Sequence, residues 1–126
     1  MSVSVDVSKL TAEGAQLLQG FVEKMGLEGA VIATAEGLEM ASYFTSDKDA
    51  DLIAADTASM LSVLSSALEN TDKGALNELI ITAEGGSIAV KDLGDDIAFA
   101  CLAPKGYKMG GLIVALKQFM KEIHSF

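Results

Sequence analysis

A chain of 126 residues that is 50% hydrophobic is long enough to bury its own core without disulfides or a structural metal. Its cationic side chains are nine lysines with no arginine, and eighteen acidic residues bring the net charge to −9. Such an acidic surface repels phosphate backbones and anionic lipid heads, so nucleic acid and membrane surfaces are poor partners.

The single cysteine, Cys101, excludes an internal disulfide and is typical of a reducing compartment. Residues 1–10 contain no basic region followed by an apolar run, so we expect no signal peptide. No stretch approaches the roughly 20 apolar residues that a membrane-spanning helix needs. We therefore expect a single cytoplasmic domain over residues 1–126, without membrane insertion.

Hydrophobic periodicity and turn signals predict eight elements in the order α-β-β-α-β-β-β-α. The predicted helices cover residues 10–25, 49–72 and 109–124, and the predicted strands cover 30–34, 38–44, 78–83, 87–93 and 97–102. The strands that contain Leu79 and Ile97 are apolar on both faces, so helices must cover the sheet on both sides. The expected fold is a three-layer α/β/α domain around a mostly antiparallel five-stranded sheet.

The predicted central helix, residues 49–72, has more apolar surface than one sheet requires. Its large apolar residues fill an arc of about 180° on a helical wheel, whereas packing on one sheet needs only about 100°. The remaining face consists mostly of alanine and serine, which would allow another backbone to approach closely. We interpret this segment as an interface helix; the alternative is a helix sunk deep in its own core.

Three stretches of the sequence, together with the element order, resemble the Roadblock/LC7 family. They are the opening hairpin from Gly29 to Leu38, the long Ala/Ser/Leu-rich central helix, and the return through Gly110-Gly111-Leu112 into the last helix. The resemblance implies a fold related to longin and profilin-like domains. It also implies dimers that bind other proteins, such as small Ras-like GTPases in prokaryotes or motor and signalling assemblies in eukaryotes.

In such dimers the third strand pairs across the two-fold axis and the central helices pack together. Carried over by position, the resemblance implies a set of dimer or partner-interface residues on these two elements. The set is Ile53, Asp56, Thr57, Met60, Leu61, Leu64, Leu68, Leu79 and Ile81.

The residues that could support catalysis or metal binding are few and scattered. The only histidine, His124, lies near the end of the last predicted helix, and Cys101 lies within an apolar strand without a base in sequence proximity. The carboxylates of Asp47, Asp49 and Asp51 resemble part of a calcium loop, but they fit a helix N-terminus better. We expect no catalytic residues, no metal site and no cofactor.

Two loops have residues that invite a functional interpretation. The segment from Lys105 to Gly111 places lysines and glycines before a helix, but it lacks the Gly-Lys-Ser/Thr ending of a phosphate-binding loop. Lys105, Tyr107 and Lys108 are instead candidates for contacts with a protein partner. The other loop, which contains Asp92, Asp95 and Asp96, is expected to be a solvated turn.

Two hypotheses for function remain. The first is a non-catalytic homodimeric scaffold or regulator that binds a small Ras-like GTPase or a related assembly. The second is a small-molecule sensor that resembles PAS, GAF or profilin-like domains, for which the alanines on the strands could leave an internal pocket.

Overall fold

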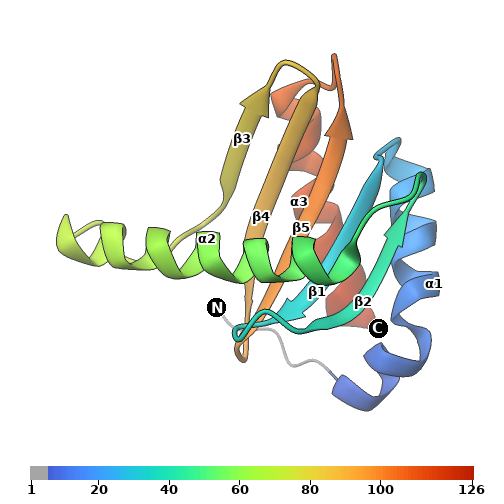
Figure 1. Ribbon diagram of the computed structural model, residues 1–126, viewed down its shortest axis with the longest axis horizontal. Coiled ribbons are helices and arrows are strands. Elements are labelled where there is room, and N and C mark those ends of the chain that lie inside the picture. Colours follow the sequence, from blue (N-terminus) through green and yellow to red (C-terminus); the bar gives the residue numbers. More distant parts are fainter. Residues whose placement is uncertain (1–5) are drawn as a thin grey trace.

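The computed structural model describes residues 6–126, so residues 1–5 of the segment examined for a signal peptide lie outside it. Figure 1 shows one sheet with helices on both of its faces. The predicted element order is confirmed. The elements are α1 (Val7–Met25), β1 (Gly29–Thr34), β2 (Glu39–Phe44), α2 (Ala50–Asn70), β3 (Leu79–Ala83), β4 (Gly86–Gly94), β5 (Ile97–Pro104) and α3 (Met109–Ser125).

The strands form one sheet in the order β2-β1-β5-β4-β3, and all four pairings are antiparallel. The two strands before α2 therefore join the three strands after it where β1 pairs with β5, and Val31 lies opposite Ala100 in that pairing. Among the described strands β3 pairs with β4 alone, so its other side is an edge of the sheet.

One face of the sheet, covered by α1 and α3, contains the larger hydrophobic cluster. At its centre the rings of Phe99 and Phe119 stack with centroids 3.9 Å apart, and Phe21 meets both rings edge-on. Cys101 lies in the same cluster, and burial raises its pKa to about 12. The thiol is therefore part of the core, as expected from its place in an apolar strand.

Helix α1 begins three residues earlier than the periodicity predicts. Asp6 is its N-cap, and its carboxylate accepts a hydrogen bond of 3.0 Å from the backbone N–H of Lys9. Ser8 and Thr11, whose side chains are also suited to capping, both lie inside the helix. Gly26 ends the helix with a positive φ of 69°, which glycine adopts without steric cost.

The other face of the sheet is covered by α2 alone. Asp49 caps this helix by accepting a hydrogen bond of 3.1 Å from the backbone N–H of Leu52. Only Ala54, Thr57 and Ala58 of its 21 residues are buried, and Ala54 packs on the cluster that contains Val31. Part of the small-residue side of α2 thus faces its own sheet through Ala54 and Ala58, whereas the rest of that side is exposed, namely Ala55, Ser59, Ser62, Ser65 and Ser66.

Helix α2 crosses the sheet and continues past β3 into solvent, as Figure 1 shows. By length and composition this helix could cross a membrane: an 18-residue stretch of it has a mean hydropathy of 1.2, and 17% of that stretch is buried. This corrects the expectation that no segment reaches that length. The expectation counted uninterrupted apolar residues, whereas an average over the helix tolerates its interspersed serines.

The state of the Cys101 thiol provides a test of the packing of the core. Because the side chain is buried and its pKa is raised to about 12, almost no thiolate exists in the folded protein near neutral pH. We expect a thiol reagent such as DTNB to react with the native protein only as fast as it unfolds, and rapidly in denaturant. A stoichiometric reaction within seconds under native conditions would contradict this placement.

Candidate protein interface

A groove with an apolar lining separates α2 from the edge strand β3. It has a volume of about 410 Å³ and is called the apolar groove below. Its lining residues are Ser59, Met60, Val63, Leu64, Leu79 and Ile81. Because Ser59 is the one polar residue among them, water in this groove has few hydrogen-bonding partners.

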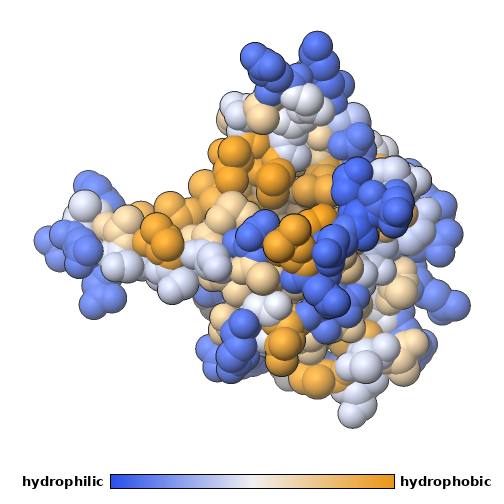
Figure 2. All heavy atoms as spheres, viewed as in Figure 1, coloured by the Kyte–Doolittle hydropathy of each residue, from blue (hydrophilic) through white to orange (hydrophobic). Residues whose placement is uncertain are grey.

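The apolar surface continues from this groove across the sheet. Ile81 pairs with Ile88, and Ile88 pairs with Leu102, so these three side chains form a row across β3, β4 and β5. Side chains two positions apart in a strand share a face, which places this row on the same face as Leu79 and α2. The row is only partly buried and is called the bare row below. In Figure 2 hydrophobic atoms gather over β3 and β4 beside α2.

The part of α2 that borders the groove also exposes large apolar side chains. Val63 is 68% exposed, and three turns toward the N-terminus Leu52 is 59% exposed. Single exposed apolar residues are ordinary, but Val63 joins a contiguous patch formed by the apolar groove and the bare row. Contiguous apolar patches of this kind mark protein-interaction sites in soluble proteins.

The edge of β3 offers backbone hydrogen-bonding groups next to this patch. Proteins commonly protect such an edge with lysine, proline or a bulge, because an unpaired strand recruits other strands. The sequence of β3, Leu-Ile-Ile-Thr-Ala, contains neither a charged residue nor proline. Its register with β4 is continuous from Leu79 to Ala83. Among the described residues, this edge of β3 thus has none of these three protective features.

The structure brings four of the nine predicted interface residues together in the apolar groove. They are Met60, Leu64, Leu79 and Ile81. Leu68 lies half-buried further along α2, two residues before the helix ends at Asn70. These five residues are therefore placed where a second molecule can reach them.

The other four predicted residues lie elsewhere on α2. Ile53 and Leu61 pack partly against the sheet beneath the helix. Thr57 is fully buried, and its hydroxyl donates a hydrogen bond of 2.8 Å to the carbonyl of Ile53. Asp56 is exposed, as the cost of burying a lone carboxylate requires.

Sequence reasoning omitted three apolar residues of this surface: Val63, Ile88 and Leu102. Val63 belonged to the large apolar arc of the central helix, so the wheel contained the signal. Ile88 and Leu102 become neighbours of the groove only through the β3-β4-β5 register. No local pattern in the sequence specifies that register.

A second groove, of about 350 Å³, lies on the opposite flank of α2 and has an acidic rim. It is called the acidic groove below. Its lining residues are Ala35, Ala58, Leu61, Ser62, Ser65, Asp92, Gly94, Asp95, Asp96, Ile97 and Ala98. The three aspartates are exposed in and beside the β4–β5 turn, as expected for a solvated loop. Asp92 also stabilises that turn, since its carboxylate accepts a 2.8 Å hydrogen bond from the N–H of Gly94.

The remaining candidate residues are separate from one another. Tyr107 donates a hydrogen bond of 2.7 Å to the carbonyl of Met25, and burial raises the pKa of its phenol. It therefore ties the β5–α3 loop to the end of α1, whereas Lys105 and Lys108 are exposed. His124 is exposed near the end of α3. Within residues 6–126 no three His, Cys, Asp or Glu side chains are grouped so as to hold a metal ion.

The fold has close counterparts among solved structures. MglB from Myxococcus xanthus superposes with a TM-score of 0.80 at 10% identity, covering 88% of this chain and 91% of that one. A Roadblock/LC7 domain from Streptomyces avermitilis gives 0.77 at 20% identity, covering 88% and 94%. The gliding protein MglB from Thermus thermophilus gives 0.78 at 12% identity, covering 99% and 93%. At these identities the likeness establishes the fold alone.

Comparison of the sequence itself gives a more specific result. A search of curated protein sequences finds no match. The family model of the Roadblock/LC7 domain matches residues 13–103, which is well over half of the chain and reaches from α1 into β5. This chain belongs to the Roadblock/LC7 family.

Proposed function

We propose that this protein is a homodimeric regulatory scaffold that binds a small Ras-like GTPase or a related assembly. The observation that carries the proposal is the overhang of α2 beside an unprotected β3 edge and an apolar groove. Three features of one protomer are thus left without partners on the same side of the molecule. A second copy of the chain supplies a partner for each of them.

The dimer follows from pairing β3 with the β3 of a second copy in antiparallel register. The two-fold axis then runs perpendicular to the sheet, so both α2 helices lie on the same face of a continuous sheet. Each overhang, including Leu68, extends across the partner's sheet toward its bare row. Val63 and Leu64 of one protomer then lie near the bare row of the other, which covers apolar surface on both.

The GTPase partner is supported by membership in the Roadblock/LC7 family. The absence of arginine from the chain limits how this protein would act on GTP hydrolysis. Without arginine it cannot insert a guanidinium group to neutralise charge in the transition state of GTP hydrolysis. Any effect on hydrolysis must therefore come from repositioning the switch loops and catalytic residues of the GTPase. This is the behaviour of a regulatory scaffold.

The sensor hypothesis has no comparable support. A small-molecule sensor encloses its ligand, whereas the apolar and acidic grooves both open to solvent. The alanines on the strands are instead used for close packing: Ala33 and Ala100 lie beneath Ala54 of α2.

Replacing Val63 by lysine tests the dimer without altering the core of the protomer. Val63 is 68% exposed in one protomer, so Val63→Lys should leave the stability of the protomer unchanged. In the proposed dimer the lysine enters an apolar contact twice, once from each copy. We expect the dimer dissociation constant to rise roughly 10- to 100-fold, measured by sedimentation equilibrium in buffer with high salt.

Val114→Lys is the matched control for this variant. Val114 is 58% exposed and also helical, but it lies on α3 at the other face of the sheet. This control should dimerise like the unmodified protein. Equal dissociation constants for the two variants would exclude the interface, and a monomeric unmodified protein at micromolar concentration would exclude the homodimer.

The regulatory mechanism predicts how lysine substitutions affect GTP hydrolysis. With small GTPases from the same source cell, we expect one to bind and its turnover to change in the presence of this protein. No single Lys→Ala variant among the exposed lysines, such as Lys73, Lys105 or Lys108, should abolish that change while binding persists. The measurement is single-turnover phosphate release, with binding followed separately by calorimetry.

A direct catalytic contribution would give the opposite result. If one lysine variant bound the GTPase normally but lost all effect on hydrolysis, that lysine would act in the active site of the GTPase. The repositioning mechanism would then be wrong, although the scaffold could still be a dimer.

A further inference from the structure

Charge is distributed unevenly along the chain. The last 30 residues contain four of the nine lysines but only one of the eighteen acidic residues, Glu122. That residue is also the one that forms an ion pair within residues 6–126, with Lys24 at 2.5 Å. The β5–α3 loop and α3 therefore have a positive charge in a protein whose net charge is −9.

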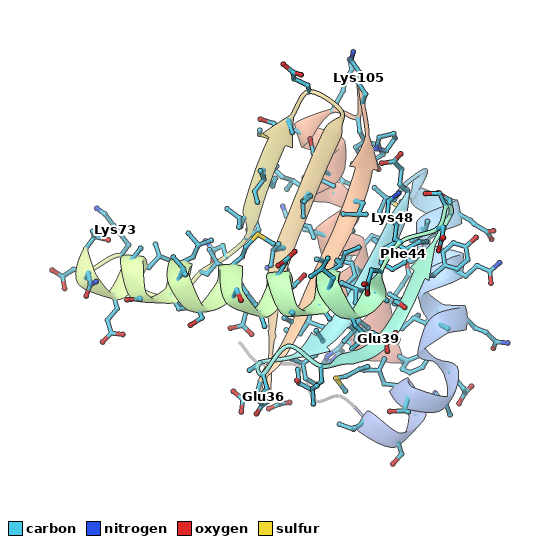
Figure 3. The ribbon with its side chains drawn as sticks, in the orientation of Figure 1. Glu36, Glu39, Phe44, Lys48, Lys73 and Lys105 are labelled. Atoms are coloured by element: carbon cyan, nitrogen blue, oxygen red, sulfur yellow. The ribbon has the colours of Figure 1, made fainter. Side chains whose placement is uncertain are left out.

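The four lysines of this region are exposed and lie on the β5–α3 loop and α3. Lys105 and Lys108 precede the helix, and Lys117 and Lys121 are one turn apart on its outer surface. None of the four side chains makes a hydrogen bond or ion pair with another described residue. They are called the lysine face below. Figure 3 shows Lys105 at the end of the sheet opposite Glu36.

The end of the sheet that lies opposite Lys105 concentrates negative charge around a concave surface, on the face of the sheet away from α3. The β1–β2 and β4–β5 turns meet there, joined by a 2.8 Å hydrogen bond from the N–H of Ala35 to the carbonyl of Asp96. Glu36 and the aspartates of the acidic groove are exposed at this end, and no lysine lines the groove. Apolar residues such as Leu61 and Ile97 also line it, so the aliphatic stem of an entering lysine has apolar atoms to contact.

We propose that the lysine face of one copy docks onto the acidic groove of another, so that molecules associate head to tail. The two surfaces have opposite charge, one is a convex helix and the other is concave, and both belong to the same chain. They lie at different places on the molecule, so the contact does not close on itself and can add further copies. A second copy is therefore the occupant that the charge distribution favours.

This contact is compatible with the proposed dimer but does not depend on it. On a helical wheel at about 100° per residue, the α2 residues that line the acidic groove lie opposite those that line the apolar groove. Ser62 and Ser65 are on the first side, and Met60 and Val63 are on the second. A dimer formed through the apolar groove thus leaves both acidic grooves and both lysine faces accessible.

The sensitivity to salt distinguishes the two contacts. Copies with a net charge of −9 repel one another at long range, and the head-to-tail contact relies on charge pairs within a Debye length of about 8 Å at physiological salt. Added salt screens both the net repulsion and those pairs. The contact weakens because its opposite charges lie closer together than the excess negative charges of the two copies, whereas salt does not weaken an apolar interface. We therefore expect large assemblies at low salt and the smaller dimer at high salt.

The experiment is sedimentation velocity of the purified chain at roughly 20 mM and 500 mM NaCl, which give screening lengths of about 20 Å and 4 Å. We expect assemblies larger than the dimer at low salt that dissociate at high salt. Lys117→Glu combined with Lys121→Glu should weaken this association at least about tenfold. Lys48→Glu with Lys73→Glu changes the net charge equally, away from the lysine face, and should have a smaller effect.

Removing two of the three carboxylates of the acidic groove gives the most discriminating result. Asp95 and Asp96 have positive φ angles of 53° and 59°, which asparagine also tolerates, so Asp95→Asn with Asp96→Asn preserves the turn. The substitution lowers the net negative charge, which by itself favours association, yet we expect the assemblies to disappear. Asp47→Asn with Asp72→Asn makes the same change in net charge elsewhere and should strengthen them.

The outcomes separate this inference from the proposed function. A dimer at both salt concentrations overturns the head-to-tail contact, and so does stronger association of the Asp95→Asn, Asp96→Asn protein. The lysine face would then belong to a different, acidic partner. A monomer at high salt with large assemblies at low salt would overturn the dimer and support the head-to-tail contact.

Discussion

The close packing of alanine between α2 and the sheet determines the rest of the structure. Ala54 rests on a layer that includes Ala33 and Ala100, so the helix backbone approaches the strands closely. Gly37, with a φ of 91°, contributes from the β1–β2 turn, where a Cβ would lie 3.1 Å from the Cα of Ala55. Because small side chains make the central contacts, the large apolar side chains of α2 lie at the margins: Ile53, Met60 and Leu61 are partly buried against the sheet, whereas Leu52 and Val63 are exposed. The exposed patch is thus a direct result of how the helix is seated.

The buried residues of the protomer form two clusters of unequal size, one on each face of the sheet. The side with α1 and α3 has three packed phenylalanines and most of the large buried side chains. The side with α2 has a smaller cluster of five buried residues, with partly buried neighbours such as Met60, Leu79 and Ile88. Most of the hydrophobic stabilisation therefore comes from the first side, which leaves the second side available for association. The candidate interface and the main core are on opposite faces of the sheet.

Much of this fold could be predicted from sequence, because periodicity and turn chemistry are local. Helix and strand order followed from the spacing of residues such as Leu18, Phe21 and Val22 and from the glycines at turns. The orientation of α2 could not be predicted in the same way. On a helical wheel, one side of α2 has large apolar residues and another has small residues, and either side can face a sheet. The alanines of β1 and β5 select the small residues, but only once the two strands are adjacent in the fold.

The candidate interface shows the same limit. Residues of α2 and β3 such as Met60 and Leu79 were predicted because the family resemblance pointed to these two elements. Ile88 and Leu102 were missed because they join the patch only through pairing between strands distant in sequence. The charge asymmetry, by contrast, is visible in the sequence, where lysines outnumber acidic residues only in the last quarter of the chain. Its meaning depends on the structure, which places those lysines away from the aspartates of the β4–β5 turn.

The unprotected edge of β3 has a consequence for specificity within the cell. Backbone N–H and C=O groups are the same in every strand, so the edge itself cannot distinguish another copy of this chain from a paralogue with the same fold. Discrimination is left to the few side chains around Met60 and Val63 that must fit against the incoming molecule. In the proposed dimer, a handful of substitutions there would be enough to change the preferred partner from a second copy to a sister subunit. The proposed pairing could therefore be diversified by side chains alone, without any change to the fold.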